Sequence, residues 1–378
     1  MATLLQVVPA LDKGGVERGT VDLAKFLVRE GHRAVVASEG GSLVEELEEA
    51  GGIHVTLPLS TKNPLGIMRN VGRLASLIRS HDVQLVHARS RAPAWSARWA
   101  AERTRVPFVT TFHAVYGGHE SRPKRRYNSV MAAGRRVIAI SDYVAEHVRR
   151  IYQVPPERLR TVYRGVDTEQ FDPEKVSAAR VEALRQQFGI ESGMKVVSLP
   201  GRITRIKGHL LLLDAVQRLC RDDFLVAFIG PDTPGSSYSR ELHERVEGSG
   251  LKNRVRFTGP CHDMPAAVAL SDVVAVPSIG PEAFGRVSVE AQAMGRPVVV
   301  TDVGGLGETL MVAATGWLVQ PDDPAGLAEA LDLALSMSPE VRDRLAQRAR
   351  AWVVDHFTAE RMCRQTLDVY GEVLEETR

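Results

Sequence analysis

Short apolar runs alternate with longer amphipathic stretches along the whole chain. Apolar runs of this length are typical of strands buried on both faces, and the stretches between them are typical of helices that cover a sheet. In the first half the predicted strands are 4–8, 34–37, 54–57, 85–88, 108–112 and 137–140. In the second half they are 195–199, 225–229, 255–258, 273–276 and 298–301. The alternation predicts an α/β fold with parallel, doubly wound sheets.

The same pattern runs twice along the chain, with a break between the two copies. Helices are expected over 16–30, 65–79, 339–356 and 359–376. A polar, helical connector over 172–190 separates the halves, and 378 residues exceed what one hydrophobic core usually organises. We therefore predict an N-terminal Rossmann-like domain over 1–172 and a C-terminal Rossmann-like domain over 173–356. A last helix, over 357–378, could pack back on the first domain.

Composition adds a charge asymmetry to this picture. Residues 1–170 hold 25 Lys/Arg against 17 Asp/Glu, a balance of +8, and the remainder holds 23 against 29, a balance of −6. The first half is therefore expected to meet an anionic partner. Three widely spaced cysteines argue against a disulfide framework. No apolar run approaches 18 residues, and the N-terminus lacks the basic region of a signal peptide, so we expect a cytoplasmic protein.

Two carboxylates, Glu282 and Glu290, stand in the stretch 281–295 that follows the predicted strand 273–276. Residues 283–294 have helical composition. Ligands of open parallel sheets bind beyond the carboxyl ends of the strands, where helix N-termini offer free N–H groups. Eight residues of helix would bring the two side chains within about 80° of each other around the axis. Two acids beside an anion-binding pocket suit a polyhydroxylated ligand that carries phosphates.

Arg202 and Lys207 follow the first predicted strand of the second half. Two cations in such a loop can neutralise a diphosphate without a metal. The alternative is a solvated loop that also carries Arg205. Gly14 and Gly15 follow the first strand of the chain and would let the backbone approach a phosphate, although a plain tight turn explains them equally well.

His113 ends the predicted strand 108–112 in T-T-F-H. A histidine there can hydrogen-bond a sugar hydroxyl or stabilise developing charge, and the alternative is a structural role. The sequence has no H-E-x-x-H, no C-x-x-C and no Asp/His cluster, so we predict no bound metal. It also lacks the G-x-S-x-G motif of hydrolases and the phosphate-binding motifs G-x-G-x-x-G and P-loop.

A basic stretch marks the first half. It contains Arg122, Lys124, Arg125, Arg126, Arg135, Arg136, Arg149 and Arg150. Anionic lipid headgroups would attract each such charge by about 1 kcal/mol. A solvated basic face is the alternative. No recognised nucleic-acid module accompanies the charges, so we predict no nucleic-acid partner.

The motifs together resemble those of the retaining glycosyltransferases of family GT4, the "glycosyl transferases group 1". The resemblance covers nearly the whole chain and rests on G-G-V-E-R, T-F-H, A-I-S-D-Y-V-A, Y-R-G-V-D, P-G-R-I-T-R-I-K-G, the E-x7-E stretch and T-D-V-G-G-L-G-E-T with T-G-W-L-V. It implies a GT-B fold, in which two Rossmann-like domains face a central cleft. The fuller sequences around these motifs resemble those of an alphaproteobacterial branch of the family that is often assigned to the assembly of lipopolysaccharide core or other envelope glycans.

The resemblance also implies roles for individual residues. Arg202 and Lys207 would bind the donor's diphosphate, and Glu290 would hold the ribose hydroxyls. Glu282 would contact hydroxyls of the transferred sugar. The remaining implied positions are His113 near the reacting sugar, the amides of Phe284 and Gly285 at that sugar, Gly14 and Gly15 in a loop closing over the diphosphate, and Asp263 in a loop flanking the base.

The implied activity is metal-independent, retaining transfer of a hexose-type sugar from a UDP- or GDP-linked donor to a lipid-linked glycan acceptor. The protein would need no cofactor and would lie peripherally on the inner face of the cytoplasmic membrane, with Arg122, Lys124, Arg125 and Arg126 toward acceptor or lipid. Alternatives are a soluble sugar or polysaccharide acceptor, a sugar-nucleotide epimerase of the same architecture, and a non-catalytic binding protein. Arg164 and Arg286 depart from the family's common pattern and favour an anionic donor sugar or a phosphorylated acceptor.

Overall fold

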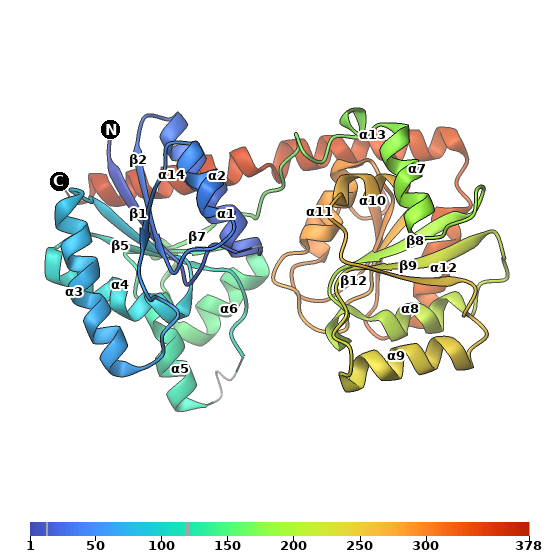
Figure 1. The fold of residues 1–378 in the computed structure, drawn as a ribbon, viewed down its shortest axis with the longest axis horizontal. Coiled ribbons are helices and arrows are strands. Elements are labelled where there is room, and N and C mark those ends of the chain that lie inside the picture. The colour runs from blue at the N-terminus through green and yellow to red at the C-terminus, as the bar shows by residue number, and fades with distance from the viewer. Residues whose placement is uncertain (13, 118–120, 378) are drawn as a thin grey trace. The chain divides into compact units, whose positions relative to one another are not determined.

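The computed structural model describes residues 1–12, 14–117 and 121–377 and divides the chain into two compact units (Figure 1). Unit 1 comprises Met1–Gly165 and Ala359–Arg378, and unit 2 comprises Val166–Thr358. The chain therefore passes between the units twice, after Gly165 and after Thr358. The sequence places these boundaries after residues 172 and 356.

Unit 1 is built on a seven-stranded, wholly parallel sheet. Its strands are β1 (Thr3–Val7), β2 (Arg33–Ser38), β3 (Ile53–Thr56), β4 (Leu85–Ala88), β5 (Phe108–Phe112), β6 (Arg136–Ala139) and β7 (Leu159–Thr161). The spatial order is β3-β2-β1-β4-β5-β6-β7. The order reverses between β1 and β4, which pair from Leu4↔Leu85 to Val7↔Ala88. A reversal of this kind is the point at which doubly wound sheets bind ligands.

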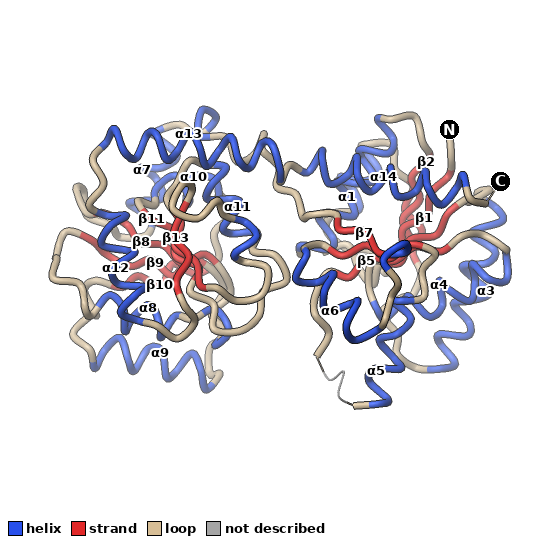
Figure 2. The backbone as a smooth tube through the Cα atoms, turned by 180° about the vertical axis from the view of Figure 1, so that it is seen from behind, coloured by secondary structure: helices blue, strands red, loops and turns tan. Residues whose placement is uncertain are grey.

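Helices cover both faces of the sheet in unit 1 (Figure 2). They are α1 (Gly15–Arg29), α2 (Val44–Glu49), α3 (Pro64–Ser80), α4 (Arg91–Thr104), α5 (Arg122–Asn128), α6 (Asp142–Tyr152) and α14 (Ala359–Glu375). The last of these comes from the end of the chain and packs against α1. Its Met362, Tyr370 and Val373 belong to the same buried cluster as Leu4 and Leu27.

Unit 2 repeats the architecture with six parallel strands. These are β8 (Lys195–Pro200), β9 (Phe224–Ile229), β10 (Val255–Gly259), β11 (Val273–Val276), β12 (Val298–Thr301) and β13 (Gly316–Val319), in the order β10-β9-β8-β11-β12-β13. The helices are α7 (Ala178–Gln187), α8 (His209–Val216), α9 (Ser237–Gly248), α10 (Met264–Leu270), α11 (Arg286–Ala293), α12 (Pro324–Leu335) and α13 (Pro339–His356). Here the order reverses between β8 and β11.

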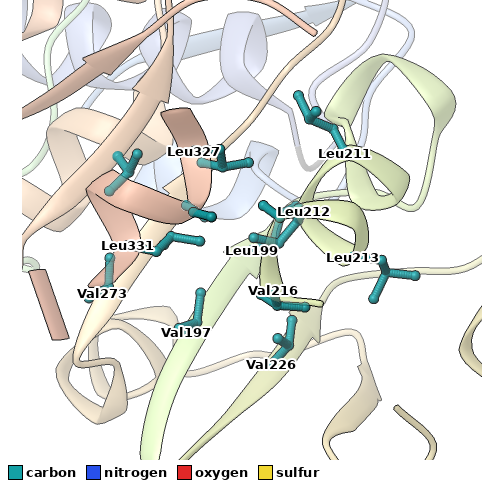
Figure 3. Packing of buried hydrophobic residues seen from close by; sticks show 14 of the residues in the cluster. Val197, Leu199, Leu211, Leu212, Leu213, Val216, Val226, Val273, Leu327 and Leu331 are labelled. Atoms are coloured by element: carbon teal, nitrogen blue, oxygen red, sulfur yellow. The ribbon is translucent and has the colours of Figure 1, made fainter. Parts of the chain in front are cut away.

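The core of unit 2 anchors the strand that leads to this reversal. Figure 3 shows Val197 and Leu199 of β8 packed among Leu212 of α8 and Leu327 and Leu331 of α12. All five are buried. Buried apolar side chains on both faces of β8 fix its position, and therefore the position of the loop that follows it.

The prediction of two doubly wound α/β domains is confirmed. Two edge strands were not predicted, β7 and β13. Both are short and only partly buried, and β7 also lacks a continuous apolar run. The prediction of helix from Ala283 onward is wrong, since α11 begins at Arg286. Gly285, with φ of 113°, holds a conformation that ends any helical path before it.

Candidate active site

The reversal point of the unit 2 sheet brings together Lys207 and Glu282. Lys207 ends a 3₁₀ turn after β8, and Glu282 lies in the loop after β11. The Lys207 Nζ donates to Glu282 Oε1 at 2.5 Å, and Ser278 Oγ donates to the same oxygen at 2.9 Å. The two charged side chains remain 26% and 20% exposed. The pair is therefore within reach of a ligand at the edge where α/β sheets bind one.

Glycines let the backbone segments of this site approach each other. Gly208, with φ of 73°, lies against the Pro277 carbonyl, and a Cβ on it would stand 1.7 Å from that oxygen. Gly304 likewise leaves no room for a Cβ beside the Glu282 carbonyl, which accepts the Gly305 N–H at 2.8 Å. Since no other residue tolerates both the positive φ and the contact, the loops after β8, β11 and β12 are fixed to one another.

Glu290 lies on α11 and is held by a different cation. Its side chain is 8% exposed, and its Oε1 accepts from Arg286 Nη2 at 2.6 Å and Nε at 3.2 Å. Because α11 begins after Glu282, the eight-residue spacing of the two acids does not correspond to two helical turns. The added cation Arg286 thus neutralises Glu290, while Lys207 neutralises Glu282.

The segment between the two acids is fixed by packing. Phe284 is buried and lies edge-on to Phe357 with ring centroids 5.5 Å apart. Gly285 faces Leu306 so closely that a Cβ would come within 2.5 Å of Leu306 Cδ2. Gly285 also caps α11 without a side-chain hydrogen bond, which leaves the first-turn N–H groups of that helix uncapped by a side chain.

Two further predicted residues of unit 2 differ in their surroundings. Arg202 is exposed, and it makes no side-chain hydrogen bond or ion pair with any residue that the structure describes. Asp263 caps α10 by accepting the Ala266 N–H at 3.1 Å, and it pairs with Arg180 at 2.7 Å. Arg180 lowers the pKa of the Asp263 carboxyl. The contacts of Asp263 are thus structural ones, whereas Arg202 is available to a ligand.

In unit 1, His113 follows β5 directly. Part of its side chain is exposed, but both ring nitrogens are enclosed and have no hydrogen-bond partner among the described residues. Burial sets the pKa of His113 well below its usual value, and the charges of Arg89 and Arg164 lower it further. The ring is therefore neutral at physiological pH and can donate or accept a hydrogen bond but carries no charge.

Gly14 and Gly15 stand at the N-terminus of α1, and Lys13, which precedes them in the quoted motif, lies outside the described residues. Gly14 has an extended backbone, with φ of −165°, so its conformation does not require glycine. A Cβ on it would instead come within 2.2 Å of Glu17 Oε2. The glycine makes room for a carboxylate at the start of α1, and no side chain caps that helix.

Most of the unpaired charge of the basic stretch lies on one helix. Arg122, Lys124, Arg125 and Arg126 of α5 are exposed and form no ion pair within the described ranges. Three of the other arginines are paired, Arg135 and Arg136 with Glu376, which directly follows α14, and Arg149 with Glu146, whereas Arg150 of α6 is exposed and has no ion pair with a described residue. We call the four unpaired residues of α5 the α5 basic cluster. Sequence proximity did not reveal that α14 supplies the neutralising acids.

Sequence reasoning missed Ser278 and Arg89. Ser278 is fully buried two residues after β11 and bonds to Glu282. Arg89 is buried directly after β4. Each polar side chain follows a strand at the reversal point of its sheet, and that position was the signal available in the sequence. Within the described ranges, no group of three or more His, Cys, Asp or Glu could hold a metal ion, and no helix has the length and apolarity needed to cross a bilayer.

Comparisons with known proteins agree with this architecture. Residues 13–170 match the family described as Glycosyltransferase Family 4, and residues 180–352 match Glycosyl transferases group 1. A D-inositol 3-phosphate glycosyltransferase of Salinispora tropica is 30% identical over 404 residues, covering 97% of this chain and 83% of that protein.

Solved structures give the same result. A glycosyltransferase from Rickettsia africae superposes with a TM-score of 0.91 at 35% identity, covering 99% of this chain and 98% of that one. The Anabaena protein HepE, in complex with UDP-glucose, superposes with a TM-score of 0.84 at 25% identity over 98% of this chain and 100% of that one. Since the two halves match the two parts of one enzyme family in order, the chain belongs to glycosyltransferase family 4 and is a glycosyltransferase with the GT-B fold.

Proposed function

We propose that this enzyme is a retaining, metal-independent glycosyltransferase that moves a hexose-type sugar from a nucleoside diphosphate sugar to a lipid-linked glycan acceptor. The observation that carries the proposal is the Lys207–Glu282 contact at the reversal point of the unit 2 sheet, with Arg202 exposed in the same loop. A cation that can leave its carboxylate for a phosphate, beside an acid that can then accept sugar hydroxyls, matches the chemistry of a sugar diphosphate.

Binding of the donor would replace the Lys207–Glu282 contact by contacts of each side chain with the donor. Lys207 and Arg202 bind the diphosphate and neutralise the charge that develops on it as it leaves, as a divalent cation does in other transferases. Glu282 accepts hydrogen bonds from the transferred sugar, and the first-turn amides of α11 face the same anion-friendly edge. Oε1 of Glu290 accepts hydrogen bonds from Arg286, and Oε2 would accept hydrogen bonds from the ribose hydroxyls.

Retention of the anomeric configuration would follow from attack on the face that the diphosphate leaves. The acceptor hydroxyl approaches as the bond to the leaving oxygen breaks, through an oxocarbenium-like state. A double displacement of the glycosidase type would need a carboxylate nucleophile on the opposite face of the sugar. The neutral ring of His113 supports a hydrogen-bonding role toward the sugar and not that of a charged acid.

The α5 basic cluster supports the lipid-linked acceptor and a peripheral site on the cytoplasmic membrane. Four exposed, unpaired charges would contribute about 1 kcal/mol each near an anionic bilayer. Replacing Arg122, Lys124, Arg125 and Arg126 by glutamine should weaken binding to phosphatidylglycerol vesicles by at least about 100-fold. Unchanged vesicle binding would favour a soluble acceptor, for which the relatives named D-inositol 3-phosphate glycosyltransferases provide the precedent.

Donor turnover tests the reaction. UDP- and GDP-linked sugars are screened by thermal shift, since a ligand at 100 times its Kd adds about 2.7 kcal/mol of apparent stability. The stabilising donor is then incubated with and without membrane extract as acceptor source, for the wild type, Lys207→Gln and the matched surface control Lys252→Gln.

Acceptor-dependent release of nucleoside diphosphate, lost in Lys207→Gln and kept in Lys252→Gln, is the expected result. Product of inverted configuration would contradict the retaining mechanism. Isomerised sugar nucleotide would identify an epimerase, and binding without turnover would identify a non-catalytic relative.

A further inference from the structure

The reversal point of the unit 1 sheet holds an arginine with no partner. Arg89 follows β4, the strand beside β1, and only 4% of it is exposed. Its Nε is enclosed without a hydrogen bond, and its guanidinium makes no hydrogen bond or ion pair with any described residue. Burial lowers the pKa of Arg89, against the weaker opposing effects of Tyr370, Cys363, Asp22 and Glu17. An arginine buried in this way is costly unless an anion pairs with it.

Two histidines on neighbouring strands differ in their hydrogen bonding. His87, on β4, is fully buried, and both of its ring nitrogens are hydrogen-bonded, to Tyr370 Oη at 2.6 Å and to Thr111 Oγ1 at 2.7 Å. His113, which follows the neighbouring strand β5, has both ring nitrogens enclosed and unpartnered. The histidine within the sheet thus has both of its hydrogen bonds, whereas the histidine at the end of the neighbouring strand has neither.

A second guanidinium lies at the same edge. Arg164 is 5% exposed and lies against α1, where a Cβ on Gly19 would come within 2.7 Å of Arg164 Nη1. The Arg164 N–H donates to the Ile140 carbonyl directly after β6, so Arg89, His113 and Arg164 follow the neighbouring strands β4 to β7 at one edge of the sheet, and the charges of both arginines act on His113. The glycine at position 19 leaves room for the guanidinium in this position. The helix α1 also begins here without a side-chain cap.

We propose that Arg89, Arg164 and His113 bind the phosphate group of an acceptor substrate, an inference that rests on the proposed glycosyl transfer. Two guanidinium groups suit a phosphate dianion, because each presents a rigid fork of N–H donors to its oxygens. The neutral ring of His113 has one N–H, which donates to the phosphate without adding charge, and its other nitrogen is left to accept from a sugar hydroxyl. His113 is of intermediate exposure at the carboxyl edge of the sheet, and a phosphate would approach from that edge.

The donor's diphosphate is a poorer fit for this cluster. It has its own cations in unit 2, Arg202 and Lys207, at the reversal point of the other sheet. The phosphate that the cluster binds belongs instead to the acceptor, either as a soluble sugar phosphate or as a phosphate on a lipid-linked glycan. Both sources share the chemistry that the cluster recognises.

Inorganic phosphate is the first probe. It is titrated calorimetrically into the full chain carrying Arg202→Gln and Lys207→Gln, which removes the competing cations of unit 2. Adding Arg89→Met should weaken phosphate binding about 10- to 100-fold, since a charge-assisted hydrogen-bonding pair is lost. The control Arg98→Met, which removes an exposed arginine paired with Glu102, should leave the affinity unchanged. Equal phosphate affinity with and without Arg89 would overturn the proposal.

Thermal unfolding in phosphate-free buffer separates a binding role from a structural one. Arg89→Met should raise the unfolding midpoint, because it removes an unpartnered buried charge, and phosphate should then no longer stabilise the protein. A lowered midpoint, or failure to fold, would mean that Arg89 supports the structure, and would overturn the proposal. Arg89→Lys, which keeps the charge, should retain phosphate binding to within about tenfold.

Two further arms identify the source of the phosphate. Binding of glucose 6-phosphate but not glucose, lost in Arg89→Met, indicates a soluble phosphorylated acceptor. Binding to phosphatidic acid vesicles that Arg89→Met weakens, without binding of glucose 6-phosphate, indicates a lipid-borne phosphate. Either result supports the cluster. UDP binding is measured on the same proteins. If the protein binds UDP but Arg89→Met leaves phosphate binding unchanged, this inference alone is overturned. If the wild type binds no sugar nucleotide, the proposed function is overturned instead.

Discussion

Replacing Gly208 by alanine should disrupt the junction that positions Lys207. Gly208 has φ of 73°, and an added Cβ would stand 1.7 Å from the Pro277 carbonyl oxygen. Since Cβ atoms essentially never approach closer than 3.0 Å, that carbonyl would have to move by about 1.3 Å or more. Ser278, the next residue, donates to Glu282, so the movement reaches both charged partners of the site.

The chain offers a matched control for the backbone strain. Gly250 has φ of 72°, and a Cβ on it would meet nothing within 4 Å. Gly250→Ala therefore measures the left-handed conformation alone, at about 1–2 kcal/mol. Gly208→Ala adds the collision, for which overpacking costs of about 1–3 kcal/mol are typical.

Thermal unfolding and donor turnover measure the two consequences. At about 2–4 °C per kcal/mol for a unit of this size, Gly208→Ala should melt about 2–12 °C below Gly250→Ala. Its turnover of the donor should fall by about 100-fold, since a displacement of about 1 Å is enough to misplace reacting groups. Equal midpoints for the two variants, together with full turnover by Gly208→Ala, would refute the role given to this contact.

Three other predictions address separate parts of the molecule. Glu290→Gln should raise KM for the donor about 10- to 100-fold in steady-state kinetics, because charge-assisted hydrogen bonds to the ribose are lost; an unchanged KM would remove Glu290 from the site. Burial lowers the pKa of His209 to about 4, so below pH 6.5 the unfolded chain binds a proton that the folded chain does not. Stability should therefore fall by about 3 kcal/mol between pH 6.5 and 4, and denaturant unfolding of His209→Phe should lack that part of the loss. Tyr370→Phe leaves Nδ1 of His87 buried without its 2.6 Å partner and should cost about 1–3 kcal/mol in denaturant unfolding, whereas no cost would mean that this bond does not hold α14 in unit 1.

The sheets could be predicted because their strands are buried on both faces. Strands 85–88, 108–112, 273–276 and 298–301 match β4, β5, β11 and β12 to the residue. The edge strand β7 has the sequence L-R-T and only intermediate burial, so its pattern did not distinguish it from a loop. Burial on both faces strengthens the sequence signal, whereas edge strands give a weaker one: β3 and β10 were predicted, and β7 and β13 were not.

The chemistry-bearing residues could be named from the sequence, but their partners could not. Lys207 and Glu282 are 75 positions apart, and only the parallel pairing of β8 with β11 brings them into contact. Arg136 belonged to a basic stretch in the sequence, yet its charge is neutralised by Glu372 of α14 and by Glu376, which directly follows that helix. Long-range ion pairs depend on topology, which local composition does not encode.

Calorimetric titration of UDP and GDP tests most directly where the donor's diphosphate binds. The wild type is compared with Arg202→Gln/Lys207→Gln and with the surface control Arg240→Gln/Lys252→Gln, both of whose native side chains are exposed in unit 2. One of the two nucleotides should bind to the wild type and to the control alike, and at least about 100-fold more weakly to the variant that lacks Arg202 and Lys207. Undiminished affinity in that variant would contradict the assignment of the donor to the reversal point of the unit 2 sheet.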